Sequence, residues 1–214
     1  MATKHSGKHS GPEHALERLV FFSDAVFAIA ITLLVIEIHV PRLPPGSTNQ
    51  DYFVALAHLI PSFFGFFVSF WVIGAFWIVH HRAFSLAAHY RDSLLTPNLA
   101  VLCGIVFIPF ATAFMAANTG MLVPQALYDL TLIVCGLLHL RLNRMVTSPP
   151  VVSEQADPLT IALTRVRGWS VTLGAACALA IGFVDSHYSQ VALITIPLWR
   201  ILLQRRTRRR FPAA

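Results

Sequence analysis

Six long runs of apolar residues, separated by short polar stretches, organise this 214-residue chain. About 20 consecutive apolar residues are needed for a helix to cross the hydrocarbon core of a bilayer. Runs near this length predict membrane-spanning helices at residues 19–40, 53–79, 97–117, 122–141, 167–184 and 189–203. The last run is short enough for a tilted or re-entrant piece. Pro61 and Pro109 should bend their helices, because proline removes a backbone donor and crowds the preceding turn.

Composition supports the same fold class. Hydrophobic residues make up 56% of the chain and charged residues only 12%, whereas soluble domains carry roughly 25% charged residues. We therefore expect an all-α integral membrane protein with six transmembrane helices. A polar N-terminal segment, 1–17, is expected to be disordered, 18–204 to form the transmembrane domain and 205–214 to be a basic tail.

The distribution of basic residues predicts the topology. With a cytoplasmic N-terminus, the outer loops contain a single basic residue, Arg42, and both termini lie inside. The inner side then holds Lys4, Lys8, Arg18, Arg82, Arg91, Arg141, Arg144, Arg165, Arg167 and the C-terminal cluster. That cluster follows a span directly, so anionic lipid headgroups rather than nucleic acid are its expected partner. A compact chain without a targeting segment suggests a bacterial plasma membrane.

One stripe of the first helix is apolar at its centre and polar at its outer end. At 100° per residue the stripe comprises Phe22, Ala25, Ile29, Leu33 and Ile36. Thr32 lies beside it, and Glu37 borders it at the outer end. Copies of the helix around a symmetry axis would form apolar rings that gate by dewetting, with a carboxylate ring concentrating cations at the mouth. Ordinary packing or lipid contact would produce the same stripe, with Thr32 bonded to a preceding carbonyl and Glu37 reaching water.

Asp24 faces nearly the opposite side of this helix and needs a partner, since an unpaired carboxylate at lipid depth is costly. Segment 77–82 supplies the candidates. The expected polar network contains Ser23, Asp24, Trp77, His80 or His81, and Arg18 or Arg82. Its main expected task is to hold the first helix, although histidine also permits a proton-relay role. The adjacent histidines lack the i, i+4 spacing of a metal site, so neither a metal nor a cofactor is expected.

These residues resemble the first-helix signature of the transmembrane protein 175 family of potassium channels. The resemblance rests on Arg18, on Phe22-Ser23-Asp24 and on the run 28–34, and segment 77–84 is similar to a second signature of bacterial members. It implies a homotetramer with a central pore lined by the first helix, conducting potassium ions with a modest preference over sodium. It also implies that Ile29 is the main constriction, with Leu33 and Ile36 as further apolar layers and Thr32 as a hydroxyl layer. Phe22, Ser23 and Asp24 would then serve packing and polar networks between helices.

Two other classes of function remain open. A proton-coupled secondary transporter would use Asp24 with His80 and His81 as its coupling site. An intramembrane hydrolase would need paired groups, and only Asp24 with Asp129 offers a formal pair, so the chain is not expected to be an enzyme.

Overall fold

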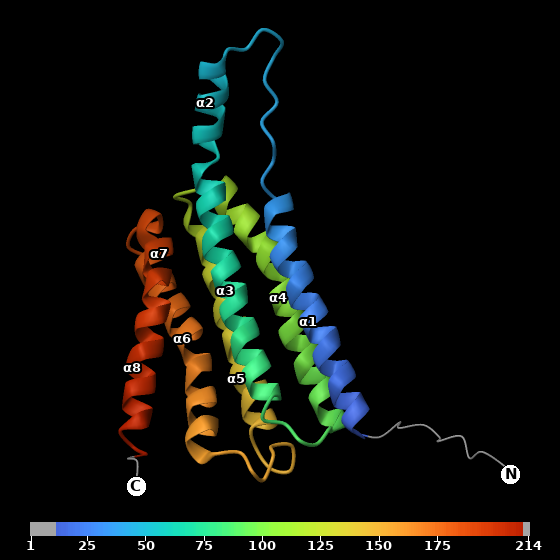
Figure 1. Cartoon of the computed structure of the whole chain (residues 1–214). Helices are drawn as coiled ribbons and strands as arrows, with labels where there is room; N and C mark the ends of the chain where they lie inside the picture. Colours follow the sequence, from blue (N-terminus) through green and yellow to red (C-terminus); the bar gives the residue numbers. More distant parts are fainter. Residues whose placement is uncertain (1–11, 212–214) are drawn as a thin grey trace, which may run out of the picture.

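The computed structural model describes residues 12–211, which form a bundle of α-helices (Figure 1). The α-helices are α1 (Pro12–Ile36), α2 (Asn49–His58), α3 (Ile60–Phe84), α4 (Leu95–Ala117), α5 (Leu122–Val146), α6 (Pro158–Gly182), α7 (Ser186–Ala192) and α8 (Ile196–Arg208). Two short 3₁₀ helices, η1 (Asp92–Leu94) and η2 (Leu193–Thr195), precede α4 and α8. The all-α prediction is therefore confirmed.

The first helix begins earlier than the sequence suggested. α1 begins at Pro12, so residues 12–17, which we expected to be disordered, are helical. Proline suits the first helical position because its missing N–H would be unpaired there anyway. The expectation for residues 1–11, which includes Lys4 and Lys8, lies outside the described residues, as does that for 212–214. The basic tail begins within α8, which extends to Arg208.

Within residues 12–211, four helices are long and apolar enough to cross a membrane: α1 from His14, α3, α4 together with η1, and α5. The expected second span, 53–79, is instead divided at Leu59, where α2 ends and α3 begins with Pro61 in its first turn. α6 is also 25 residues long, but it carries Arg165 and Arg167. The expected sixth span is broken into α7, η2 and α8. Six helical crossings are therefore not established by length and composition alone.

Close helix packing builds the core of the bundle. α1 packs on α3 and α4, and α6 lies against α5 on one side and α7 and α8 on the other. Gly136 of α5 allows one of these close approaches, since a side chain there would collide with Thr172 of α6. Small residues let membrane helices approach in this way, and the gain is van der Waals contact rather than expulsion of water.

The segment between α1 and α3 stands apart from this core. Residues 37–48 and α2 extend beyond the end of the bundle (Figure 1), and no residue from 37 to 58 is buried. α2 is held by a capping box, in which Thr48 Oγ1 accepts from the Asp51 N–H and Asp51 Oδ2 accepts from the Thr48 N–H at 2.7 Å. Local hydrogen bonds therefore stabilise this helix in place of tertiary packing.

The α2 cap predicts a specific titration. Hydrogen bonds from the backbone and then the side chain of Thr48 lower the pKa of Asp51 below its usual 3.8. Because the pKa is lowered by folding, the cap stabilises α2 at neutral pH and is lost as the pH falls through the lowered pKa. We expect Thr48→Ala to raise the pKa of Asp51 toward 3.8 in carboxyl-detected NMR of labelled protein. Ser47→Ala, which removes a hydroxyl bonded only to the Pro44 carbonyl, is the control. An Asp51 pKa unchanged by Thr48→Ala would contradict the cap.

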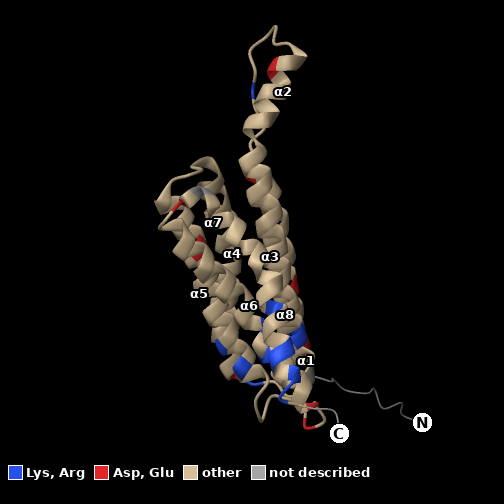
Figure 2. Ribbon diagram, turned by 90° about the vertical axis from the view of Figure 1, so that its left-hand side faces the viewer, with Lys and Arg blue, Asp and Glu red and all other residues tan. Residues whose placement is uncertain are grey.

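Basic residues gather at the end of the bundle opposite α2 (Figure 2). They come from the C-terminal parts of α3, α5 and α8, from the N-terminal part of α6 and from the start of α1. Arg42, in the segment that leads to α2, is at the other end. The two ends of the bundle therefore differ strongly in charge.

Candidate functional site on the first helix

The apolar stripe of α1 lies on the outside of the folded chain. Ile29 is 56% exposed, Ile36 is 69% exposed and Phe22 is 52% exposed, while Leu33 is half-buried. The opposite face is packed into the core through Leu19, Ser23, Phe27, Ala30 and Leu34. The chain therefore leaves uncovered the face of α1 for which the sequence predicts a pore-lining role.

The two polar groups beside the stripe are also uncovered. Thr32 is exposed, and its hydroxyl donates to the carbonyl of Ile29 at 2.8 Å, a common local bond of helical threonines. That bond uses the proton of the hydroxyl and leaves a lone pair on the oxygen free to meet a cation. Glu37 is exposed just beyond the last residue of α1. Its position at the helix end fits a group at the mouth of a passage.

A buried chain of hydrogen bonds holds the packed face of α1. The Ser23 hydroxyl donates to the carbonyl of Leu19 at 2.8 Å, so its oxygen is left to accept from the Asn98 amide N–H at 2.9 Å. The Asn98 carbonyl oxygen then accepts from Nε2 of His80 at 2.9 Å. This order of donors places the His80 proton on Nε2. The chain joins α1, α4 and α3 through side chains that are all fully buried.

The hydrogen-bond partner of Asp24 is a tryptophan and not one of the expected cations. Its Oδ1 accepts a hydrogen bond from the indole Nε1 of Trp77 at 2.9 Å, and the Trp77 ring stacks on His81 with centroids 5.5 Å apart. Within residues 12–211 no hydrogen bond or ion pair joins Asp24 to Arg18 or Arg82. The single network expected from the sequence is thus two separate links, one through Ser23 and one through Asp24.

Trp77→Phe is expected to lower the melting temperature of the detergent-solubilised protein by a few degrees. The change removes the donor to a half-buried carboxylate and costs about 1 kcal/mol, since the site is partly open. Trp71→Phe is a matched control, because Trp71 lies on the same helix and is 74% exposed. Equal melting of the two variants would show that the Asp24 contact contributes nothing to stability.

Several buried polar residues were not predicted from the sequence, among them Asn98, His139 and Asn143. His139 lies beside His80 with ring centroids 5.7 Å apart, and it stacks on Phe76 at 5.3 Å. Among the described residues, neither ring nitrogen of His139 nor the side-chain amide of Asn143 finds a hydrogen-bond partner. Their i, i+4 spacing on α5 was a usable signal, since two polar residues on one face of an apolar helix seldom face lipid.

A second polar layer lies closer to the α2 end of the bundle and is separate from the first. Ser69 contacts the hydroxyls of Thr112 and Tyr128 at 2.7 and 3.0 Å. Asp129 accepts from Gln125 and lies 2.9 Å from the Ser189 hydroxyl. Asp24 and Asp129 therefore belong to different networks, which leaves a paired-carboxylate hydrolase without geometric support. The part of the chain that the structure describes also has no group of three or more His, Cys, Asp or Glu placed to hold a metal ion.

Comparison with known proteins decides the family. The family described as endosomal/lysosomal potassium channel TMEM175 matches residues 18–109. A potassium channel of Streptomyces collinus is 33% identical over an alignment of 181 residues that covers 82% of this chain and 86% of that protein. The chain belongs to the TMEM175 family.

The structural comparison agrees with the TMEM175 assignment. A crystal structure described as a lysosomal potassium-selective channel TMEM175 homolog from Chamaesiphon minutus superposes with a TM-score of 0.71 at 26% identity, covering 91% of this chain and 98% of that one. The mouse protein, named endosomal/lysosomal proton channel TMEM175, is 34% identical over 97 residues, and the alignment covers 43% of this chain but only 19% of its own length. This TMEM175 member is thus a multi-pass membrane protein. Its relatives are named as ion channels, in agreement with the expectation that it is not an enzyme.

Proposed function

We propose that the chain is one subunit of a potassium-conducting channel, a homotetramer in which four copies of α1 line a central pore. The observation that carries the proposal is the uncovered apolar stripe of α1, whose opposite face is fixed in the core by buried hydrogen bonds. A helix held in this way presents its free face in a constant orientation. The potassium-channel names of the relatives support potassium as the permeant ion.

In this proposal the apolar residues of the stripe and the two polar residues beside it have different roles. Rings of Ile29, Leu33 and Ile36 form the hydrophobic constriction, and Thr32 contributes a layer of hydroxyl oxygens beside it. Glu37 concentrates cations at the mouth. An apolar constriction favours potassium over sodium only modestly, because it relies on the easier dehydration of the larger ion.

We place six crossings in a bacterial plasma membrane, formed by α1, α3, α4, α5, α6 and the broken unit α7–α8. The basic end of the bundle in Figure 2 faces the cytoplasm, as positive residues on the inner side favour. Both termini are then cytoplasmic, and the arginines that end α8 meet anionic lipid headgroups. No cofactor takes part, and potassium is present only as the permeant ion.

Flux measurements on the purified protein test the proposal. Liposomes loaded with potassium should release it passively when the protein is present. The release rate should not saturate with potassium concentration, as the rate of a carrier does. The mass of the detergent-solubilised protein should equal four subunits. No flux under any potassium gradient, or a monomeric protein that conducts, would contradict the proposal.

The alternative is a proton-coupled carrier that uses Asp24 with His80 and His81. The name of the mouse relative favours proton movement, but the two histidines do not act as a unit here. His80 is buried and bonded to Asn98, whereas His81 is exposed and stacked on Trp77. Saturable flux that depends on a proton gradient and disappears with Asp24→Asn would favour the carrier.

A further inference from the structure

Two neighbouring cavities of about 370 Å³ each open on the side of the bundle near its basic end. The first lies where the loop after α3 meets the end of α5, and its wall contains Arg91, Ser93, Arg141 and Arg144. The second runs between α4 and α5. Ser93, Arg141 and Met145 line both cavities, so the two share a wall.

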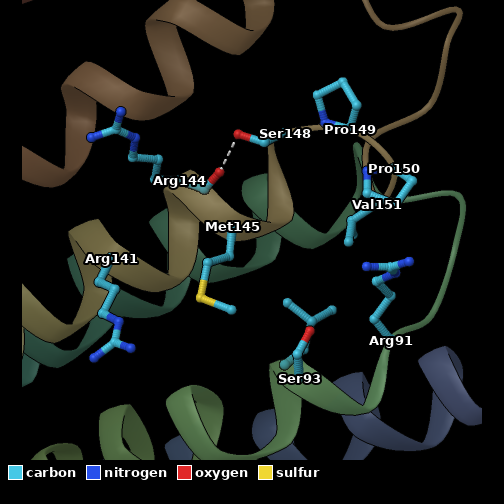
Figure 3. A pocket seen from close by; sticks show the side chains of 10 residues that line it. Arg91, Ser93, Arg141, Arg144, Met145, Ser148, Pro149, Pro150 and Val151 are labelled. Atoms are coloured by element: carbon cyan, nitrogen blue, oxygen red, sulfur yellow. Dashed lines mark hydrogen bonds between the residues drawn. The ribbon is translucent and has the colours of Figure 1, made fainter.

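The first cavity is basic. In Figure 3, Arg91 and Arg141 stand on opposite sides of Ser93 and Met145, while the guanidinium of Arg144 points away from Met145 toward the neighbouring helix. Arg91 and Arg141 are exposed, and neither pairs with a carboxylate within residues 12–211. Asp92 is next to Arg91 in the chain, yet it is not part of the cavity wall. Arg91, Arg141 and the Ser93 hydroxyl therefore line the first cavity, and its wall contains no carboxylate.

The second cavity is mostly apolar. Pro97 and Ala100 of α4 line it on one side and Leu138 of α5 on the other. These residues lie deeper along their helices than Ser93 and Arg141, because α4 runs away from the basic end and α5 runs toward it. The two cavities therefore adjoin each other. The first is charged and lies at the membrane boundary, and the second is mostly apolar and lies at the depth of the hydrocarbon core.

We propose that these joined cavities bind an anionic phospholipid. Its phosphate lies between Arg91 and Arg141 with Ser93 as a further donor, and one acyl chain follows the groove past Pro97, Ala100 and Leu138. Arginine suits this role because its guanidinium forms two parallel hydrogen bonds with phosphate oxygens. The apolar groove selects a lipid over free phosphate, because only a lipid carries both the charge and the chain.

Native mass spectrometry of the full chain in detergent tests this site. We expect phosphatidylglycerol to bind more tightly than phosphatidylcholine with the same acyl chains. Arg91→Gln/Arg141→Gln should weaken phosphatidylglycerol binding about thirtyfold, since each arginine near a membrane surface contributes about a factor of five. Each single variant should show about a fivefold loss, and the singles replace the double variant if it does not fold.

Two controls separate the site from general electrostatics. Arg42→Gln removes one positive charge from the exposed segment at the other end of the bundle and should leave binding within about a factor of two of wild type, whereas each single variant in the cavity loses more. Ala100→Phe fills the groove without changing any charge and should weaken phosphatidylglycerol binding. Glycerol phosphate, which has the headgroup but no chains, should not compete.

Three results would overturn the proposal. Equal losses in Arg42→Gln and in the single cavity variants would assign binding to net charge. Full competition by glycerol phosphate would make the first cavity a site for free phosphate. Unchanged binding in Ala100→Phe would show that no acyl chain lies in the groove. A neighbouring subunit would then be the expected occupant of the groove.

Discussion

Ile29→Asn is expected to raise potassium flux through the reconstituted channel about tenfold and to reduce its preference over sodium. Ile29 is the exposed apolar residue nearest the middle of the stripe. In a pore, a ring of isoleucines excludes water, so an ion must shed part of its hydration shell there. An amide ring keeps the constriction wet, and a barrier lower by about 1.4 kcal/mol gives the tenfold increase. Liposome flux assays with potassium and then sodium gradients measure both effects.

Val35→Asn is the matched control for Ile29→Asn. Val35 lies on the same helix and is similarly exposed, but it is turned about 120° away from the stripe. We expect it to leave both rate and selectivity near those of wild type. Equal effects of the two substitutions would mean that polarity anywhere on α1 disturbs the protein, and the pore assignment of Ile29 would then be lost.

Asn98→Leu is expected to lower the stability of the protein by about 2 kcal/mol, or its melting temperature by about 4 to 8 °C. Leucine has a similar volume, but it cannot accept from His80 or donate to Ser23. The His80 Nε2–H is then buried without its partner, and α1 loses its polar link to α4. Thermal melting of the detergent-solubilised protein measures the loss.

A second variant distinguishes a broken hydrogen bond from poor packing of leucine. Asn98→Leu/His80→Phe removes both partners, and a phenylalanine ring can still stack on Phe84 as His80 does at 4.5 Å. Because replacing both partners with apolar groups leaves no orphaned donor, we expect this double variant to melt above the single one. Further loss in the double variant would show that the histidine ring has a separate structural role.

The sequence was most informative where one helix could be read alone. The stripe of α1 follows from 100° per residue, and the structure leaves that same face uncovered. The short last run was also visible, because length acts locally, whereas Pro61 was expected only to bend the second span, which the structure instead divides at Leu59. The helical start at Pro12 was missed, since the polar residues before Arg18 resemble a disordered tail in composition.

Contacts between helices were less predictable. The sequence placed Ser23, Asp24 and segment 77–82 in one network, but it could not order their hydrogen bonds. Asn98 bridges Ser23 and His80 from a third helix, and nothing in the pattern of α4 says which neighbours it meets. Trp77 was expected near Asp24, yet the choice of its indole over an arginine depends on the relative rotation of α1 and α3. Such rotations come from the packing of the whole bundle.

The separation of residues 37–58 from the core has a consequence for how the chain can be divided. Because no residue in this segment is buried, the segment is a covalent tether that contributes little to holding α1 in place. Helix packing and the hydrogen bonds of Ser23 and Asp24 hold α1 against the rest of the protein. Gly46, at a positive φ of 90°, marks a sharp turn in the tether with open space around it. The chain is therefore suited to split-polypeptide complementation: one fragment carrying α1 and a second carrying α2 to α8 would reassociate in the membrane through the same interhelical contacts.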